Sequence, residues 1–431
     1  MKKTVLFVGM LALRAAFGAV ATVEVKSFDV TDGVPHVVTA TYTLSADAIV
    51  TADVLTNGVS VGAAITTIGG DVNRRVKATG ENEVRTIVWT PDASFEGQTL
   101  SGANVKVEVT AWDDSTPPDY MAFDLLEGTN ISYYASEAAV PGGVHDIRYM
   151  REKVLMRMIP AKDVTWLMGT ELAYSNRVGG ASGSSWYFNA SRAHKVKLTR
   201  NFYIGVYQLT AAQYWAFQGT VSSSSDFLSS SYVPRATGVS SATPFNYDFL
   251  RGTGDDWPTF DEDGNFDIET SHKVAAGSFI GKLRALTGFA YLDLPTEAQW
   301  EFAARAGVEG LLPGGETNLS AANVGKYGCF SGSAAPVGSY LPNKWGLYDV
   351  IGNNVELCLD RWLDWRTLTD EERNTVSIDP VGARTETNHH AFRGAPIGQS
   401  AEYNYLSRRE NMLRNDNSTA YKTVRLAVTL Y

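Results

Sequence analysis

Cysteine is scarce in this sequence: the 431 residues include only Cys329 and Cys358. Neither belongs to a Cys-x-x-Cys motif, and two cysteines alone cannot build a structural zinc site, which takes four ligands. In an oxidising compartment the pair could form a disulfide, and otherwise both would pack as small apolar side chains. The sequence leaves these two alternatives open.

Basic residues and long apolar runs are also few. There are 37 lysines and arginines against 47 aspartates and glutamates, which gives a net charge of −10. Because nucleic-acid binding draws most of its affinity from Lys and Arg, no nucleic-acid partner is expected. Beyond the N-terminus no run approaches the roughly 20 apolar residues that span a bilayer, so no transmembrane segment is expected. The remaining composition, 44% apolar and 19% charged, is typical of a globular protein.

Residues 1–18 have the pattern of a secretory signal peptide. Lys2 and Lys3 supply the positive start, residues 4–13 are apolar, and the small residues of Ala16-Phe17-Gly18 stand before Ala19. The alternative interpretation is a short hydrophobic strand. A signal peptide predicts a secreted or periplasmic protein.

Residues 19–118 are expected to form an all-β domain. Val37–Leu44, Thr86–Trp89 and Val105–Trp112 are rich in β-branched residues, and Asn57-Gly58 is a strong hairpin signal because both residue types tolerate positive φ. About seven short strands would make an immunoglobulin- or fibronectin-III-like sandwich. We expect this domain to act as a spacer or a binding module.

The paired prolines of Thr116-Pro117-Pro118 favour an extended connection and predict a domain boundary there. Residues 119–144 are then expected to hold a linker and leading strands. Residues 145–431 are expected to form the second domain.

Two blocks in the second half are the most specific features of the chain. The first is Leu294–Arg305, which predicts a helix from Glu297 with Thr296 as its cap, and the second is Asn343–Glu356. Together they closely resemble the signature blocks of the formylglycine-generating enzyme (sulfatase-modifying factor) family. The resemblance implies an α+β, C-type-lectin-like domain over residues 145–431, and an oxidase that converts a sulfatase cysteine to formylglycine.

The resemblance also implies a calcium site at Asn353 and Glu356. Both side chains offer the hard oxygen ligands that calcium prefers, and nearby carbonyl groups could complete a shell of about six to eight. The alternative is a structural Glu356 whose carboxylate is satisfied by local backbone N–H groups.

The catalytic cysteine pair of the family, which binds copper(I), has no counterpart here. Arg393-Gly394-Ala395 stands where the family has Arg-Gly-Gly-Ser. Counting forward from Arg393 puts the cysteine positions at Gln399 and Asn404, and counting back from Arg408 puts them at Ala395 and Ser400. Neither alignment supplies a thiol, so no catalytic residue is predicted and copper is not expected.

The C-terminal block is instead rich in residue types found at recognition surfaces. Tyrosine and arginine are frequent hot-spot residues, and asparagine adapts its hydrogen bonding to a partner. We therefore predict non-catalytic binding of a ligand or protein partner through this face, with a sulfatase as one candidate partner. The alternatives are a polar surface loop without function, a formylglycine-generating oxidase, and another oxidase with an unrecognised metal site. The candidate ligand-binding residues are Tyr403, Tyr405, Arg408, Arg409, Asn411 and Arg414.

Overall fold

The structure is a computed structural model. It describes residues 22–31, 37–91, 100–101, 104–128, 130–170, 192–218, 245–253, 257–262, 266–385, 387–416 and 422–431. The chain divides into two compact units, of which the first contains residues 1–122 and 131–146, and the second contains residues 123–130 and 147–431. The predicted signal peptide lies outside the described residues.

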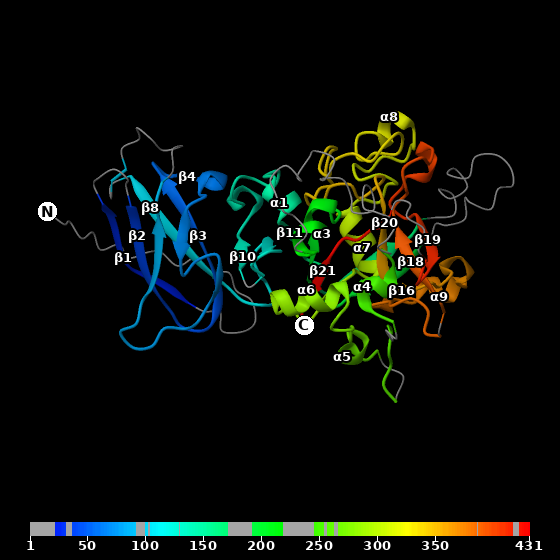
Figure 1. Ribbon diagram of the computed structural model, residues 1–431, viewed down its shortest axis with the longest axis horizontal. Coiled ribbons are helices and arrows are strands. Elements are labelled where there is room, and N and C mark those ends of the chain that lie inside the picture. Colours follow the sequence, from blue (N-terminus) through cyan, green and yellow to red (C-terminus); the bar gives the residue numbers. More distant parts are fainter. Residues whose placement is uncertain are drawn as a thin grey trace. The chain divides into compact units, whose positions relative to one another are not determined.

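The first unit is built from two antiparallel sheets around one core (Figure 1). One sheet has the order β1-β2-β7-β5, and in the other β3 pairs with β4, β6 and β8. Buried side chains from β2, β3, β7 and β8 share one hydrophobic cluster that includes Tyr42, Val50 and Trp89. The strands are β1 (Val23–Thr31), β2 (Val37–Leu44), β3 (Ala48–Thr56), β4 (Val59–Ser60), β5 (Ile68–Gly70), β6 (Arg74–Val76), β7 (Arg85–Trp89) and β8 (Val105–Trp112).

Asn57 and Gly58 form the hairpin turn that the sequence predicts. Thr56 pairs with Val59 across the turn, and the two turn residues have φ values of 52° and 78°. Positive φ at both central positions matches the right-handed twist of the flanking strands. The strands described between residues 37 and 112 therefore follow from the sequence pattern.

The predicted boundary at residue 118 falls a few residues before the point where the units divide. β9 (Tyr120–Asp124) crosses that point, and β10 (Ile131–Tyr134) belongs to the first unit. Short 3-10 turns occur in this unit at η1 (Gly62–Ala64) and η3 (Glu137–Ala139).

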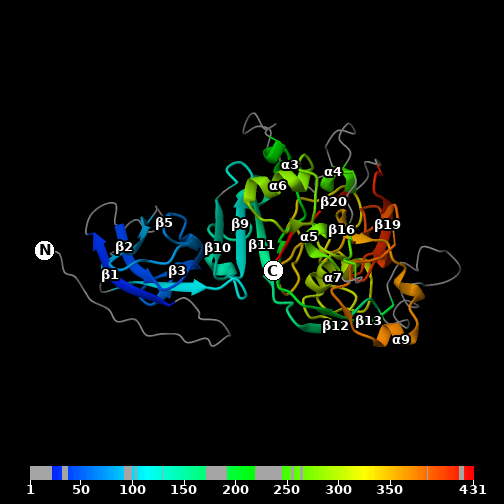
Figure 2. The same ribbon diagram turned by 90° about the horizontal axis from the view of Figure 1, so that it is seen from below.

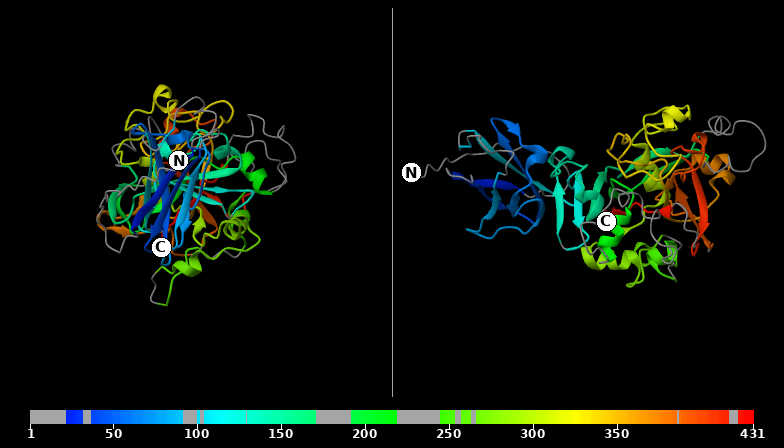
Figure 3. Two further views of the ribbon diagram at one scale, coloured as in Figure 1. Left: turned by 90° about the vertical axis from the view of Figure 1, so that its left-hand side faces the viewer. Right: turned by 45° about the horizontal axis from the view of Figure 1, so that its top comes forward.

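In its described residues, the second unit contains three groups of paired strands. The strands β11 (Lys153–Ile159), β14 (Phe202–Gly205), β21 (Ala427–Thr429) and β15 (Leu292–Asp293) are paired antiparallel in that order. In the second group β13 (His194–Leu198) lies between β12 (Val164–Met168) and β17 (Ser377–Ile378), beside α9 (Figure 2). The third group is β19 (Arg409–Leu413), β18 (His389–Arg393), β16 (Val355–Arg361) and β20 (Lys422–Thr423), whose orange and red ribbons lie side by side in Figure 3.

Short helices complete the second unit. They are α1 (Arg148–Arg151), α3 (Ala211–Gln218), α4 (Tyr247–Arg251), α5 (Ile268–Ser271), α6 (Phe279–Thr287), α7 (Glu297–Arg305), α8 (Ala321–Val324) and α9 (Asp370–Asn374), with 3-10 turns η7 (Trp365–Thr367) and η8 (Ala401–Tyr403). Among the described residues, no helix is both long and apolar enough to cross a membrane.

Helix α7 is the central helix of this unit. It begins at Glu297 as predicted, and Thr296 and Gln299 cap it reciprocally through side chain and backbone. All nine of its residues are buried, and Ala298, Trp300 and Phe302 belong to a core cluster with β12, β13 and β14. Because Glu297, Glu301 and Arg305 are buried too, this helix must bring charges into the interior.

Candidate functional site

The first turn of α7 faces two arginines from the C-terminal block. Arg409 donates from Nε and Nη2 to the two carboxylate oxygens of Glu297, at 2.7 and 2.5 Å. Arg393 Nε lies 3.1 Å from Glu297 Oε1. None of the three side chains is more than 1% exposed. Such a two-point contact fixes both orientation and charge, so it ties the start of α7 to β18 and β19.

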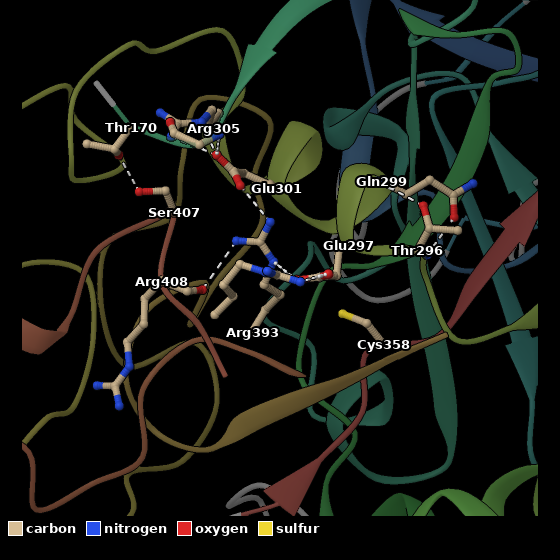
Figure 4. Close-up of polar contacts among 12 residues, drawn as sticks. Thr170, Thr296, Glu297, Gln299, Glu301, Arg305, Cys358, Arg393, Ser407 and Arg408 are labelled. Carbon is tan, nitrogen blue, oxygen red and sulfur yellow. Dashed lines mark hydrogen bonds and ion pairs between the residues drawn. The ribbon is translucent and has the colours of Figure 1, made fainter. Parts of the chain in front are cut away.

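The next turn of α7 extends the same network (Figure 4). Arg393 Nη2 donates to Glu301 Oε2 at 2.6 Å, and Arg305 Nη2 lies 2.7 Å from Glu301 Oε1. Glu301 Oε1 also accepts from the backbone N–H of Gly169 at 2.8 Å. Burial opposes ionisation of Glu301, but Arg305, Arg393 and these hydrogen bonds outweigh it and lower its pKa. The carboxylate is therefore held as an anion inside the fold.

Glu356, one of the two predicted calcium ligands, is the centre of a second buried network. Its carboxylate accepts from Trp300 Nε1 at 2.6 Å and from Gln208 Nε2 at 2.9 Å. Arg425 donates to both of its oxygens, at 3.0 and 2.8 Å. The side chain of Glu356 is thus satisfied by three side chains, and its charge is balanced by a guanidinium.

Asn353, the other predicted calcium ligand, is likewise engaged by the protein. Its Oδ1 accepts from the backbone N–H of Ala335 at 3.0 Å. Its Nδ2 lies 3.3 Å from Asp349 Oδ1, and the other oxygen of Asp349 accepts from the N–H of Gly338. Since Arg425 already supplies the positive charge beside Glu356, a calcium ion held by Asn353 and Glu356 would have to displace this guanidinium. Calcium stays a prediction that a metal titration can test.

The two cysteines are buried thiols without a disulfide between them. Cys358 has no exposed surface, and burial raises the pKa of its thiol well above the usual value. Cys329 lies on the loop after α8 and donates to the carbonyls of Ser331 and Ser333. Since the thiolate is the nucleophile and the metal ligand, Cys358 is held in its unreactive form.

The two alternative pairs of positions for the family's catalytic cysteines, Gln399 with Asn404 and Ala395 with Ser400, differ in exposure. Ala395 and Asn404 are buried, Gln399 is partly buried, and Ser400 is exposed at the start of η8. The segment packs on the 329–353 region through hydrogen bonds from the N–H of Ile397 to the carbonyl of Asn353 and from the N–H of Gly398 to that of Phe330. No thiol stands at any of these positions.

The structure divides the six predicted ligand-binding residues into two groups. Tyr405, Arg408 and Arg409 are buried, and the two arginines are paired with Glu410 and Glu297. Their side chains therefore take part in packing and ion pairing inside the fold. The other three, Tyr403, Asn411 and Arg414, are partly or fully exposed, and Arg414 is bonded to Asp248.

Within the part of the chain that the structure describes, no group of three or more His, Cys, Asp or Glu is arranged to hold a metal ion. His390 is engaged by the protein instead of a metal ion. Its Nδ1 is 3.1 Å from the carbonyl of Leu359, its ring stacks on Tyr247, and burial lowers its pKa to about 3.

Sequence reasoning missed the role of the acids of α7. The sequence pattern predicted the start and the cap of α7, but not that its acids are ion-pair partners of Arg393, Arg409 and Arg305. The available signal was the buried, apolar surrounding of Glu297 and Glu301, because charged residues at such positions need partners.

The sequence of this second unit is similar to that of a known protein family. The model for the sulfatase-modifying factor enzyme 1-like domain matches residues 160–423, more than half of the chain. The formylglycine-generating enzyme of Thermomonospora curvata is 37% identical over 110 residues, covering 22% of this chain and 35% of that enzyme. The serine/threonine-protein kinase pkn1 of Chlamydia pneumoniae is 48% identical over 69 residues, covering 16% of this chain and 10% of the kinase.

Two solved structures are similar to this chain at lower sequence identity than these curated relatives. PvdO from Pseudomonas aeruginosa gives a TM-score of 0.42 at 19% identity, covering 64% of this chain and 94% of that chain. Treponema denticola variable protein 1 gives a TM-score of 0.42 at 19% identity, covering 64% of this chain and 95% of that chain.

The second unit is a domain of mixed helices and strands of the formylglycine-generating-enzyme type. The chain is a member of the sulfatase-modifying factor family. The matched segments span well under two thirds of each curated relative's own length.

Proposed function

We propose that this protein is an exported, non-catalytic recognition protein, which uses the sulfatase-modifying-factor fold to bind a ligand or protein partner through the exposed part of its C-terminal block. The observation that carries the proposal is the absence of thiols from the block where the family resemblance requires them. The two cysteines elsewhere are both buried.

The contact surface in this proposal centres on β19. That strand is the last in the order β19-β18-β16-β20, and edge strands are common sites of partner binding. Asn411 is exposed and Leu413 is 46% exposed, while Arg409 anchors the strand to α7 from the inside. A rigidly held strand with exposed polar and apolar side chains favours recognition because little ordering is needed on binding.

The non-catalytic part of the proposal is tested with a sulfatase-type Cys-x-Pro-x-Arg peptide. Purified residues 19–431 are incubated with the peptide, copper(I), oxygen and a thiol reductant, and the peptide mass is measured. We expect an unchanged peptide, with the Thermomonospora curvata enzyme converting it under the same conditions as the control. Loss of the thiol with gain of an aldehyde would contradict the proposal.

The second candidate function is a formylglycine-generating oxidase. The similarity to enzymes of that name favours it, but fold-level analogy is a weak argument because function depends on the site. It would require copper ligands other than the family's cysteine pair.

Two further parts of the proposal concern the N-terminal half. We infer export from the signal-peptide pattern, and a mature chain beginning at Ala19 in N-terminal sequencing of secreted material would support it. The two sheets and single core of the first unit are compatible with an immunoglobulin-like spacer. Retention of the uncleaved chain in the cell would contradict export.

A further inference from the structure

A cavity of about 240 Å³ lies in the second unit, away from the C-terminal block. Its wall combines the start of α7, the end of β21, the turn after β13 and the segment that follows β17. For comparison, an apolar cavity of about 150 Å³ holds benzene. This cavity is therefore large enough for a ligand built on one substituted six-membered ring.

One side of the cavity is aromatic. Trp257 meets Phe266 and His272 edge to face, with ring centroids 5.2 and 5.0 Å apart, and His272 is followed by Tyr431 at 6.1 Å. Edge-to-face contacts at these separations are the favoured arrangement of aromatic rings. The side chains therefore form a wall that exists before any ligand arrives.

The imidazole of His272 in this wall is held in place by Asp293. His272 Nδ1 lies 3.2 Å from Asp293 Oδ2, and Asp293 is also paired with Arg251 and Arg284. Burial opposes ionisation of Asp293, but the charges and hydrogen bond of Arg251, His272 and Arg284 lower its pKa overall. The base of the aromatic wall is thus fixed by a buried ion cluster.

The other side of the cavity is polar, and its groups are fixed but not saturated. Asp379 accepts from the backbone N–H and the hydroxyl of Thr199, which leaves part of the capacity of a carboxylate for a ligand. Thr296 Oγ1 accepts from the N–H of Gln299, so its own proton can still be donated. Arg200 is exposed, with its guanidinium 4.8 Å from the centre of the Tyr431 ring.

We propose that this cavity binds a neutral hydroxylated ring of pyranose size. Such a ring has a C–H face to pack against the aromatic wall that includes Tyr431, beside the guanidinium of Arg200. Its hydroxyl groups can both donate to Asp379 and accept from Thr296 or Arg200. A purely apolar ligand would leave these polar groups without a partner in the cavity. An anion would meet Asp379 as well as Arg200, so neither net charge is favoured.

This inference is independent of the proposed function, because the cavity contains none of the residues assigned to the C-terminal face. Binding to the cavity could therefore be present or absent whether or not the protein is an enzyme.

The test is saturation-transfer NMR on the full chain with glucose, galactose, mannose and, as a contrasting set, phenylalanine and glycine. We expect saturation of C–H protons on one ring face of at least one hexose. Tyr431→Ala should weaken binding about tenfold by removing the aromatic platform. Tyr431→Phe keeps the ring and should bind as the unaltered protein does.

The control for a general effect is Leu341→Ala, which removes an exposed apolar side chain outside the cavity. Should Tyr431→Ala not fold, Asp379→Asn carries the same test, since asparagine tolerates the positive φ of 40° at this position. Lack of transfer to every hexose, binding by Tyr431→Ala or Asp379→Asn equal to that of the unaltered protein, or transfer to the amino acids alone would overturn the proposal.

Discussion

At the scale of single residues, Glu297 has the largest predicted effect on stability. Glu297→Gln would leave Arg409 and Arg393 buried with one carboxylate fewer between them. Removing one partner of a buried ion pair costs about 3–5 kcal/mol, so we expect a loss of that order in the free energy of unfolding. Urea denaturation measures it.

The matched control is Glu371→Gln on α9, where the side chain is exposed. Surface changes of this kind alter stability by about 0.5 kcal/mol or less. Equal effects of the two substitutions would contradict the assignment of Glu297 to the buried network.

Asp360 gives a prediction of pH dependence. Burial and the negative charge of Glu297 raise its pKa well above the usual value, while Oδ2 accepts from the N–H of Glu297. A raised pKa in the folded state means that the stabilising contribution is complete below the unfolded pKa and is lost as the pH rises through the folded pKa.

Asp360→Asn keeps an acceptor and stays neutral at every pH. We therefore expect its Tm to equal that of the unaltered protein near pH 4 and to exceed it increasingly toward pH 8. Thermal unfolding monitored by circular dichroism at several pH values checks this. A difference that does not change with pH would show that Asp360 is not protonated in the fold.

At the scale of elements, the helix cap of α7 can be tested directly. Thr296→Ala removes the hydroxyl that accepts from the N–H of Gln299, and N-cap losses cost about 1 kcal/mol. Thr369→Ala removes the equivalent capping box of α9, a helix without buried residues. Because α7 is packed in the core, we expect a clear drop in Tm for the first variant and a smaller one for the second.

Elements with a local signal could be predicted from the sequence. The Asn57-Gly58 turn, the strands Val37–Leu44 and Val105–Trp112 and the start of α7 depend on turn chemistry, side-chain alternation and capping, which neighbouring residues determine. The role of Arg409 depends on a partner 112 positions away, Glu297, and local patterns carry no information on such a pair. The cavity likewise combines Arg200, His272, Asp379 and Tyr431 from distant parts of the chain.

At the scale of the whole molecule, the open question for the fold is whether a metal ion contributes to its stability. The family resemblance predicts calcium at Asn353 and Glu356. In the structure the carboxylate of Glu356 accepts hydrogen bonds from Arg425, Trp300 and Gln208. An ion present at 100 times its dissociation constant would stabilise the folded state by about 2.7 kcal/mol. The two alternatives therefore differ by a measurable amount.

We expect the Tm of the full chain to be the same in excess calcium and in EGTA, because Arg425 already neutralises Glu356. Glu356→Gln should lower the Tm equally in both solutions, since it leaves the buried guanidinium of Arg425 without its carboxylate partner. A saturable rise in Tm with calcium that disappears in Asn353→Ala would reverse this conclusion. The buried arginine would then have to be displaced from Glu356 by the ion, and the second network would be a metal site closed by Arg425 only in the absence of calcium.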